Sequence, residues 1–237
     1  MTSLFPSFTK TWHNKPYPFI DPTRPELSAE GKNIVVTGGG TGIGRAIGVA
    51  FAKAGAKSVV ILGRRADKLE EGKKAISAAA SKATTVSYKS VDLVKKEDTV
   101  RAFEAIAQEF GKIDVLVANA SVYGAGGKIA DLSAEGLMST LELNTVTVLH
   151  SLQAFLPHAA EGAVLIHSNS SMSHMAPWAG AGAYPISKAT SLKLMDYFAT
   201  ENPQLRVIST QPCWTPTDLN GYEPKATDSR KRFVLVC

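Results

Sequence analysis

Cysteine is scarce in this sequence: of its 237 residues, only Cys213 and Cys237 are cysteines. Two cysteines are too few for a disulfide framework or for a structural zinc site of the CxxC type. The five histidines also lack the HExxH spacing of a metal-binding helix. We therefore expect no metal site.

Long apolar stretches and blocks of one charge are missing as well. The sequence contains no run of about 18 apolar residues, so no membrane-spanning helix is expected. Lysine and arginine number 26 against 21 acidic residues, and this net charge of +5 is spread along the chain. Such a mild excess favours anionic ligands without requiring nucleic acid. We predict a cytoplasmic protein with no membrane partner and no nucleic-acid partner.

The N-terminal segment, 1–31, differs in composition from the rest of the chain. Five prolines alternate with aromatic residues there, which indicates an extended arm. Its aromatic side chains would pack on the body of the protein or on a second subunit; alternatively, the segment is a partly disordered leader. Hydrophobic residues make up 44% of the chain, so residues 32–237 can form one globular domain.

From residue 32 onward, short β-branched runs alternate with longer stretches of helical periodicity. The expected strands lie at 34–37, 58–62, 84–91, 115–118, 164–167 and 206–210, and the expected helices at 44–54, 67–80, 96–110, 133–155 and 184–200. Strands that are apolar on both faces and separated by helices indicate right-handed βαβ crossovers. We therefore predict an α/β fold with a doubly wound parallel sheet of the Rossmann type, in a single domain of six or seven strands.

A glycine-rich segment follows the first expected strand directly. It reads Thr-Gly-Gly-Gly-Thr-Gly-Ile-Gly over residues 37–44 and leads into the first helix. Glycines between a strand and a helix N-terminus let the backbone approach a pyrophosphate, whose charge the helix dipole favours. The segment predicts a dinucleotide-binding loop with contacts from Gly38, Thr41, Gly42, Ile43 and Gly44.

Arg64 is the residue expected to select the cofactor, because it follows Gly44 by about 20 residues along the chain. An acidic residue at about this distance would hold the ribose diol of NAD, and neither Gly63 nor Arg64 can do so. A guanidinium is suited to a bidentate grip on a 2′-phosphate, so NADP(H) is predicted in preference to NAD(H). The alternative is that Arg64 and Arg65 are solvated residues at the start of a helix.

Four later motifs follow the glycine loop, whose spacing is TGxxxGxG. They are Asp92 in Val-Asp-Leu, Asn119-Ala120, the pair Ser170-Ser171, and Tyr184-Pro-Ile-Ser-Lys188. Together these motifs resemble the short-chain dehydrogenase/reductase family, in particular its fungal members. The resemblance implies a catalytic tetrad of Asn144, Ser171, Tyr184 and Lys188, since the intervals that separate the first three along the chain are similar to those of the family. It also implies cofactor contacts from Asp92, Asn119, Tyr184, Lys188, Thr215 and Thr217.

Tyr184 and Lys188 lie four positions apart, so their side chains share a face if both belong to one helix. Pro185 fits only the first turn of a helix, which places Tyr184 near the helix start. An ammonium about 5 Å away would lower the pKa of Tyr184 by about two units from about 10, making it a usable general acid or base. Ser171 would hydrogen-bond the substrate oxygen. The resemblance adds that Lys188 binds the nicotinamide ribose and that Asn144 holds a water between Lys188 and solvent.

These features predict an enzyme, an NAD(P)-dependent oxidoreductase acting on CH–OH and C=O groups. The leading interpretation is an NADPH-dependent reductase that interconverts a carbonyl and an alcohol on a small to medium apolar substrate. Methionine and tryptophan residues in segments near the expected pocket favour an apolar or aromatic substrate. The alternatives are a dinucleotide-binding protein with weak or no catalysis, and a non-redox member of the family that acts on a biosynthetic intermediate.

The sequence also departs from the family pattern. Ser121 and Cys213 stand where the family usually has glycine, which adds bulk beside the cofactor. Little chain follows Thr217, so the resemblance implies a shortened C-terminal region in which residues 230–237 form either a last strand or a frayed end. It further implies a homodimer or homotetramer that assembles through the two long helices.

Overall fold

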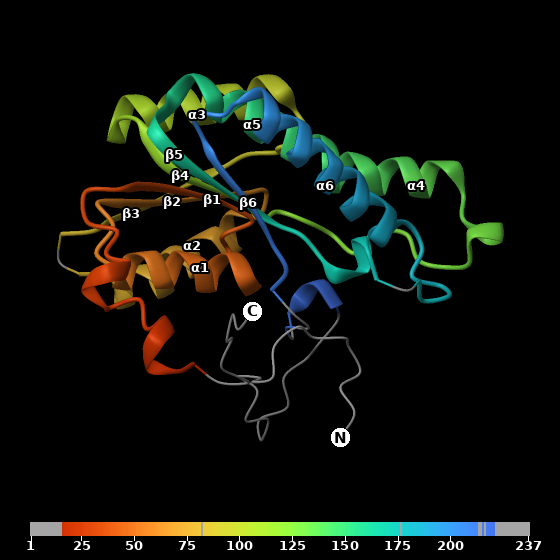
Figure 1. Cartoon of the computed structure of the whole chain (residues 1–237), viewed down its shortest axis with the longest axis horizontal. Helices are drawn as coiled ribbons and strands as arrows, with labels where there is room; N and C mark the ends of the chain where they lie inside the picture. The colour runs from red at the N-terminus through yellow and green to blue at the C-terminus, as the bar shows by residue number, and fades with distance from the viewer. Residues whose placement is uncertain (1–15, 82, 176, 213–214, 216, 221–237) are drawn as a thin grey trace.

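A parallel sheet of six strands forms the centre of the computed structural model (Figure 1). The structure describes residues 16–81, 83–175, 177–212, 215 and 217–220. The strands are β1 (Asn33–Thr37), β2 (Ser58–Gly63), β3 (Thr85–Ser90), β4 (Ile113–Ala118), β5 (Ala159–Ser168) and β6 (Arg206–Thr210). Every neighbouring pair is parallel, in the order β3-β2-β1-β4-β5-β6. The predicted doubly wound α/β fold is confirmed, with all six predicted strands.

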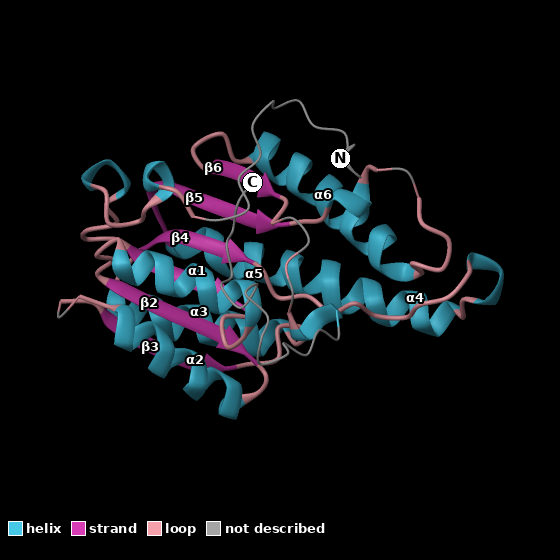
Figure 2. Cartoon of the chain, turned by 90° about the horizontal axis from the view of Figure 1, so that it is seen from below, coloured by secondary structure: helices cyan, strands magenta, loops and turns pink. Residues whose placement is uncertain are grey.

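Helices cover both faces of this sheet (Figures 1 and 2). On one face lie α1 (Gly42–Lys53) and α2 (Ala66–Ala79), and on the other lie α3 (Lys96–Phe110), α5 (Thr147–Phe155) and α6 (Ala183–Glu201). The chain builds β2 and β3 on one side of β1 and then places β4, β5 and β6 on the other side. Ligands of open parallel sheets bind at the carboxyl ends of the strands where the order reverses. The ends of β1 and β4 are therefore the expected position of the site.

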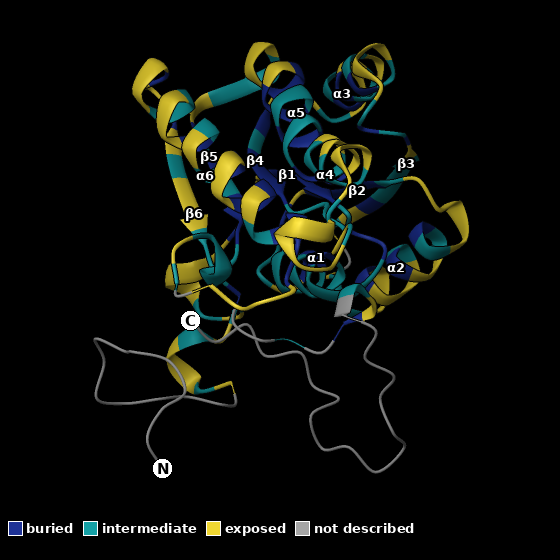
Figure 3. Cartoon of the chain, turned by 90° about the vertical axis from the view of Figure 1, so that its right-hand side faces the viewer, coloured by how far each residue is buried: buried dark blue, intermediate teal, exposed yellow. Residues whose placement is uncertain are grey.

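Both faces of the sheet are apolar, which explains why its strands read as continuous hydrophobic runs. Val35 belongs to a buried cluster with Phe103 and Phe155, whereas its neighbour Val36 belongs to a second cluster with Leu69. Successive side chains of a strand point to opposite faces, so β1 feeds both layers. Figure 3 shows the buried residues gathered on the strands and on the inward sides of the helices. Each fully buried phenylalanine contributes about 2–3 kcal/mol to folding.

The long helix predicted at 133–155 is interrupted in the structure. α4 (Ala134–Leu141) and α5 are separated by a π-helical turn over Glu142–Val146, which contains Asn144. A π turn is frequent at functional sites. Periodicity could not reveal this turn, because the chain stays helical on both sides of it.

The predicted extended arm at 1–31 is described from residue 16. This part forms two 3-10 turns, Pro18–Ile20 and Pro25–Leu27, and is not extended. Each turn begins with proline, whose fixed φ suits a first helical position. Glu30 then forms an antiparallel bridge with Ala56, which attaches the end of the segment to the body.

The remaining expectations concern the C-terminal region, membrane-spanning helices and metal binding. The strand considered within 230–237 lies outside the described residues, as does Cys213. Within the described ranges, no helix is long and apolar enough to cross a bilayer. The same residues bring no three histidine, cysteine or acidic side chains together in a way that could hold a metal ion.

Candidate active site

The glycine loop after β1 is closely packed against the end of β4. Gly38 has a φ of +66°, and a Cβ there would lie 2.9 Å from the Cα of Ala120. A Cβ on Gly44 would lie 2.3 Å from the carbonyl oxygen of Gly38. Neither position can carry a side chain without moving backbone. The loop therefore requires glycine at both places.

The start of α1 is suited to an anion. Thr41 occupies the N-cap position but its side chain makes no capping hydrogen bond, and the first turn contains no acidic residue. The first N–H groups of a helix have no partners within the helix, and the helix dipole adds positive potential there. The N–H groups of Gly42, Ile43 and Gly44 can therefore receive a phosphate, as the sequence predicted. Thr217 is buried beside them, since a Cβ on Gly42 would lie 3.2 Å from its Cγ2.

Asn119 fastens the end of β4 to the glycine loop. The main-chain N–H groups of Asn119 and Ala120 both donate to Oγ1 of Thr37, over 2.9 and 3.0 Å. The Asn119 side chain donates to the carbonyl oxygen of Thr37 over 3.0 Å. Asn119 thus stabilises the glycine loop by holding the main chain that would contact a phosphate. Thr215, also predicted as a cofactor contact, donates its hydroxyl to the carbonyl oxygen of Pro212.

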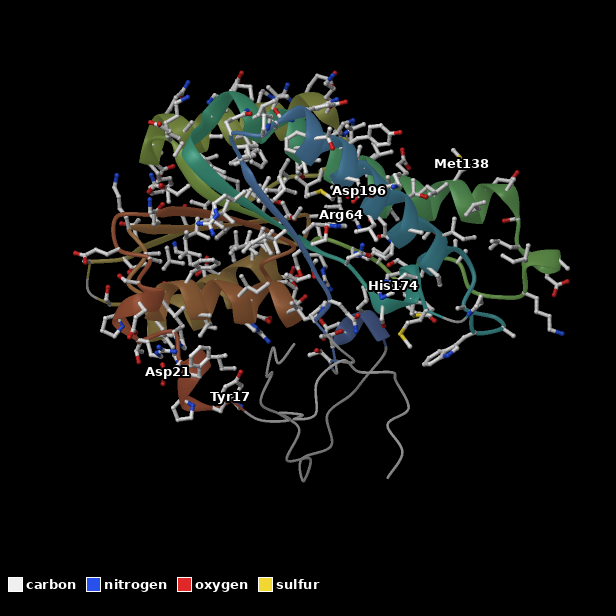
Figure 4. All side chains as sticks on the ribbon, in the orientation of Figure 1. Tyr17, Asp21, Arg64, Met138, His174 and Asp196 are labelled. Atoms are coloured by element: carbon white, nitrogen blue, oxygen red, sulfur yellow. The ribbon has the colours of Figure 1, made fainter. Side chains whose placement is uncertain are left out.

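A cavity of about 670 Å³ opens beyond the ends of β2 and β3, and Arg64 and Asp92 both line it. Two other cations at this cavity are already paired: Lys89 binds Glu109 over 2.9 Å, and Arg101 binds Asp98. Within the described part of the chain, the exposed guanidinium of Arg64 has no such partner (labelled in Figure 4). The residue predicted to grip a 2′-phosphate is therefore the available cation of the cavity.

Tyr184 and Lys188 lie at the start of α6, as predicted. Gly182, with a φ of +64°, is the N-cap, so Pro185 falls in the first turn, where its missing N–H is harmless. The Lys188 Nζ lies 5.8 Å from the centroid of the Tyr184 ring and donates to the carbonyl oxygen of Ser168 over 2.9 Å. Both side chains are buried, with exposed fractions of 8% and 3%.

Burial governs the protonation of this pair. Burial raises the pKa of Tyr184; its hydrogen bond with the Ser170 hydroxyl acts in the opposite direction, and the nearby Tyr123 raises the pKa further. Burial also lowers the pKa of Lys188 to about 8, so the amine still carries its charge at pH 7. The sequence predicted a pKa of Tyr184 below its ordinary value because of Lys188, and this net direction is wrong, since burial raises the pKa in the structure. Residue spacing gives the distance between two groups but not the cost of removing both from water.

Ser170, which directly precedes the predicted Ser171, has its hydroxyl close enough to Tyr184 to act on the pKa of that tyrosine. The chain turns at this point, because Ser170 is the N-cap of a 3-10 turn over Ser171–Ser173 and its Oγ accepts from the N–H of Met172. Ser171 lies within that turn, where its carbonyl oxygen accepts from His174 and Met175. The interval along the chain to Tyr184 is the reason why the sequence predicted Ser171, the second serine of the pair.

Asn144 lies fully buried in the π turn and joins three segments. Its Oδ1 accepts from the Ser121 hydroxyl over 3.0 Å and from the Val122 N–H over 2.8 Å. Its Nδ2 donates to the Val122 carbonyl over 2.8 Å and to the Ser187 hydroxyl over 2.9 Å. The side-chain amide is therefore saturated with protein partners. It holds the loop after β4 against α6.

Sequence reasoning missed Tyr123, which stacks on Tyr184. The two ring centroids lie 5.2 Å apart, with an interplanar angle of 16°. Tyr123 follows Asn119-Ala120 closely in the chain, and nothing in that spacing signals an aromatic contact. The site thus contains one more aromatic group than the motifs predicted.

The sequence of the chain is similar to those of known proteins of one family. A family model described as short chain dehydrogenase matches residues 32–228. The chain is 33% identical over 235 residues to the short chain dehydrogenase pigC of Monascus ruber, covering 96% of this chain and 76% of that protein. It is 31% identical over 224 residues to the short chain dehydrogenase/reductase AacuD of Aspergillus aculeatus, covering 92% and 76%.

Solved structures are similar as well. An alcohol dehydrogenase from the archaeon Thermococcus sibiricus, complexed with 5-hydroxy-NADP, matches with a TM-score of 0.73 and 29% identity, over 82% of this chain and 81% of that one. A short chain dehydrogenase from Burkholderia cenocepacia in complex with NADP matches with a TM-score of 0.74 and 28% identity, over 81% and 77%.

Proposed function

The chain belongs to the short-chain dehydrogenase family and is an NAD(P)-dependent oxidoreductase, and we propose that it is an NADPH-dependent reductase that interconverts a carbonyl and an alcohol. The observation that carries this proposal is the convergence of Tyr184, Lys188 and Ser170 at the carboxyl end of β5. The glycine loop lies at the same edge of the sheet, after β1. The nearness of a proton donor and a dinucleotide cradle to one edge of the sheet supports a reaction that uses both.

The residues of the chain have distinct tasks in this proposal. The glycine loop and Arg64 would hold NADPH, which would supply the hydride that the carbonyl carbon receives. Tyr184 donates its phenolic proton to the carbonyl oxygen, so that an alcohol is formed. The Ser170 hydroxyl, in the role that the sequence assigned to Ser171, hydrogen-bonds the same oxygen as negative charge develops on it. The positive charge of Lys188 stabilises the tyrosinate that remains until a proton is recovered from solvent.

Preference for NADPH rests on Arg64, and Arg64→Ser tests it. Loss of a charge-assisted bond to the 2′-phosphate costs about 1.5–3 kcal/mol. We expect KM for NADPH to rise about 10- to 100-fold, with KM for NADH changing little. Steady-state kinetics with both cofactors measure this, and Arg206→Ser, an exposed arginine at the other end of the sheet, is the control. Equal changes for NADPH and NADH would contradict the assignment.

The proposed substrate is a small to medium apolar carbonyl compound. Trp178, 51% exposed, and the half-buried Met172 and Met175 lie in the segment between β5 and α6 that carries Ser170. Met195 on α6, by contrast, is 2% exposed and belongs to the core. The segment before α6 therefore supplies the apolar surface beside Tyr184.

A homodimer or homotetramer is part of the proposal, as is residence in the cytoplasm. An apolar cavity of about 380 Å³ lies between α5 and α6, lined by Leu149, Leu194 and Tyr197 among others. Tyr197 on α6 and Met138 on α4 are 63% and 62% exposed, and Figure 4 shows Met138 at the outer surface. A second copy of the chain would cover this apolar face.

Transfer of deuterium tests the reaction itself. NADPH deuterated at its transferable hydrogen is incubated with the protein and a panel of aliphatic and aromatic ketones and aldehydes, and products are analysed by mass spectrometry. We expect an alcohol that contains one deuterium, formed in step with NADPH consumption. Cofactor binding without product would favour the binding-only alternative. A product of altered mass without deuterium and without NADPH consumption would favour the non-redox alternative.

A further inference from the structure

Tyr123 is the nearest aromatic neighbour described for Tyr184. Its ring lies almost parallel to that of Tyr184, at 16°, with the centroids 5.2 Å apart. Tyr123 is 38% exposed, whereas Tyr184 is only 8% exposed. One face of the catalytic ring is therefore covered by Tyr123, which stands between it and solvent.

The loop that carries Tyr123 is anchored immediately before and after it. Asn144 binds both the N–H and the carbonyl oxygen of Val122 over 2.8 Å each. The Thr140 hydroxyl accepts from the N–H of Ala125 over 3.0 Å. Gly124, with a φ of +73°, packs so closely on Thr140 that a Cβ would lie 2.3 Å from its Oγ1. The backbone of Tyr123 thus lies between two fixed points on α4 and on the π turn.

The same loop is joined to the start of α6. The carbonyl oxygen of Ala125 accepts from the N–H of Ala183 over 3.0 Å, and the N–H of Gly127 donates to the carbonyl oxygen of Gly180 over 3.1 Å. Gly127 also forms a parallel bridge with Ala181. The strand-like segment before Tyr184 and the loop that carries Tyr123 therefore form one unit, in which the two rings are set against each other by main-chain bonds.

We propose that Tyr123 is a positioning residue for Tyr184, which fixes the orientation of the catalytic ring by stacking on it. The proposal rests on the proposed function, because a proton donor is needed for carbonyl reduction. Tyr123 acts through Tyr184, and its own hydroxyl transfers no proton to substrate. An aromatic pair of this geometry stabilises one ring orientation more than burial alone does.

The charges around Tyr184 agree with this role. Burial and the nearby Tyr123 both raise the pKa of Tyr184, and the Ser170 hydroxyl acts against them. The Nζ of Lys188 on α6 lies 5.8 Å from the centroid of the Tyr184 ring, and burial together with Lys188 lowers the pKa of His167 on β5 to about 3. His167 is therefore neutral at pH 7. Removing the Tyr123 hydroxyl is expected to lower the pKa of Tyr184, and removing the ring is expected to admit water to it.

The experiment compares Tyr123→Phe, which keeps the stack, with Tyr123→Leu, which removes it. Tyrosine labelled with carbon-13 at Cζ reports the ionisation of Tyr184 by NMR without cofactor, and Tyr184→Phe assigns its signal. We expect Tyr123→Phe to lower the titration midpoint of Tyr184 while retaining most of kcat. We expect Tyr123→Leu to shift the Tyr184 signal at neutral pH and to lower kcat about tenfold, with KM for NADPH within about twofold. Tyr197→Phe, on the exposed side of α6, should change neither.

Either the NMR titration or the kinetic measurement can overturn the proposal. An unchanged Tyr184 signal and midpoint in both Tyr123 variants would show that the stack does not govern the ring. Altered signals with unchanged kcat in Tyr123→Leu would show that positioning is not needed for turnover. If Tyr123→Leu does not fold, the titration of Tyr123→Phe still decides the electrostatic part. Absence of deuterium transfer in the wild-type protein would instead refute the proposed function, and the NMR titration distinguishes the two failures.

Discussion

Tyr184→Phe is expected to lower kcat for carbonyl reduction by about 10²- to 10⁴-fold, the contribution of a well-placed general acid. The substitution removes one hydroxyl and keeps the ring, so the stack with Tyr123 and the start of α6 are retained. NADPH consumption with a responsive carbonyl substrate measures the effect, and fluorescence titration with NADPH shows that cofactor binding is preserved. KM for the cofactor should change little, because the proton is transferred to the substrate.

The chain offers a matched control for this pair. Lys73 Nζ lies 5.9 Å from the ring centroid of Tyr88, nearly the same distance as the 5.8 Å between Lys188 and Tyr184. Tyr88 lies on β3 at the edge of the sheet, away from the end of β5. Tyr88→Phe should therefore retain the wild-type kcat. Undiminished NADPH consumption by the Tyr184→Phe variant would refute the proposed mechanism.

The elements of the fold could be predicted because their causes are local. Alternating β-branched runs and helical stretches placed all six strands, and Pro185 correctly placed Tyr184 in the first turn of α6. The glycine loop could also be predicted from the sequence, since Gly38 needs a positive φ and Gly44 has no room for a Cβ. Such requirements restrict the residue type at one position, so they leave a signal in the sequence.

The interior of the site could not be predicted in the same way. The interval to Tyr184 favoured Ser171, but it did not show that the hydroxyl of the neighbouring Ser170 also acts on the pKa of Tyr184. The direction of the Tyr184 pKa depends on how much surrounding protein excludes water, which no interval along the chain expresses. The saturated bonds of Asn144 and the Tyr123 stack likewise depend on segments that meet only in the folded protein.

The burial of His167 also results from tertiary packing. We expect it to make the folding stability of the protein depend on pH in acid. His167 lies in β5 with no exposed surface, its Nδ1 lies 3.4 Å from the Ser209 hydroxyl, and its buried Nε2 has no hydrogen-bond partner among the described residues. Burial, aided by the positive charge of Lys188, lowers the pKa of His167 to about 3. In the unfolded chain the pKa returns to about 6.5. The folded protein therefore holds this imidazole neutral over a range of pH in which the unfolded chain is protonated.

His167→Gln is expected to make the protein less sensitive to acid. Between pH 6.5 and about 3 the unfolded wild-type chain binds one more proton than the folded protein at this site, so stability falls as the pH falls. The loss approaches about 1.4 kcal/mol per pH unit, or about 3 kcal/mol at pH 4.5, and the variant lacks it. Urea unfolding at pH 7.5, 5.5 and 4.5 measures the difference, and His174→Gln, at an exposed histidine, should follow the wild type. Parallel curves for the wild type and His167→Gln across this range would show that His167 is protonated in the folded protein. In that case the buried ammonium of Lys188 would face a second positive charge, and the electrostatic basis assigned to Tyr184 would have to be replaced.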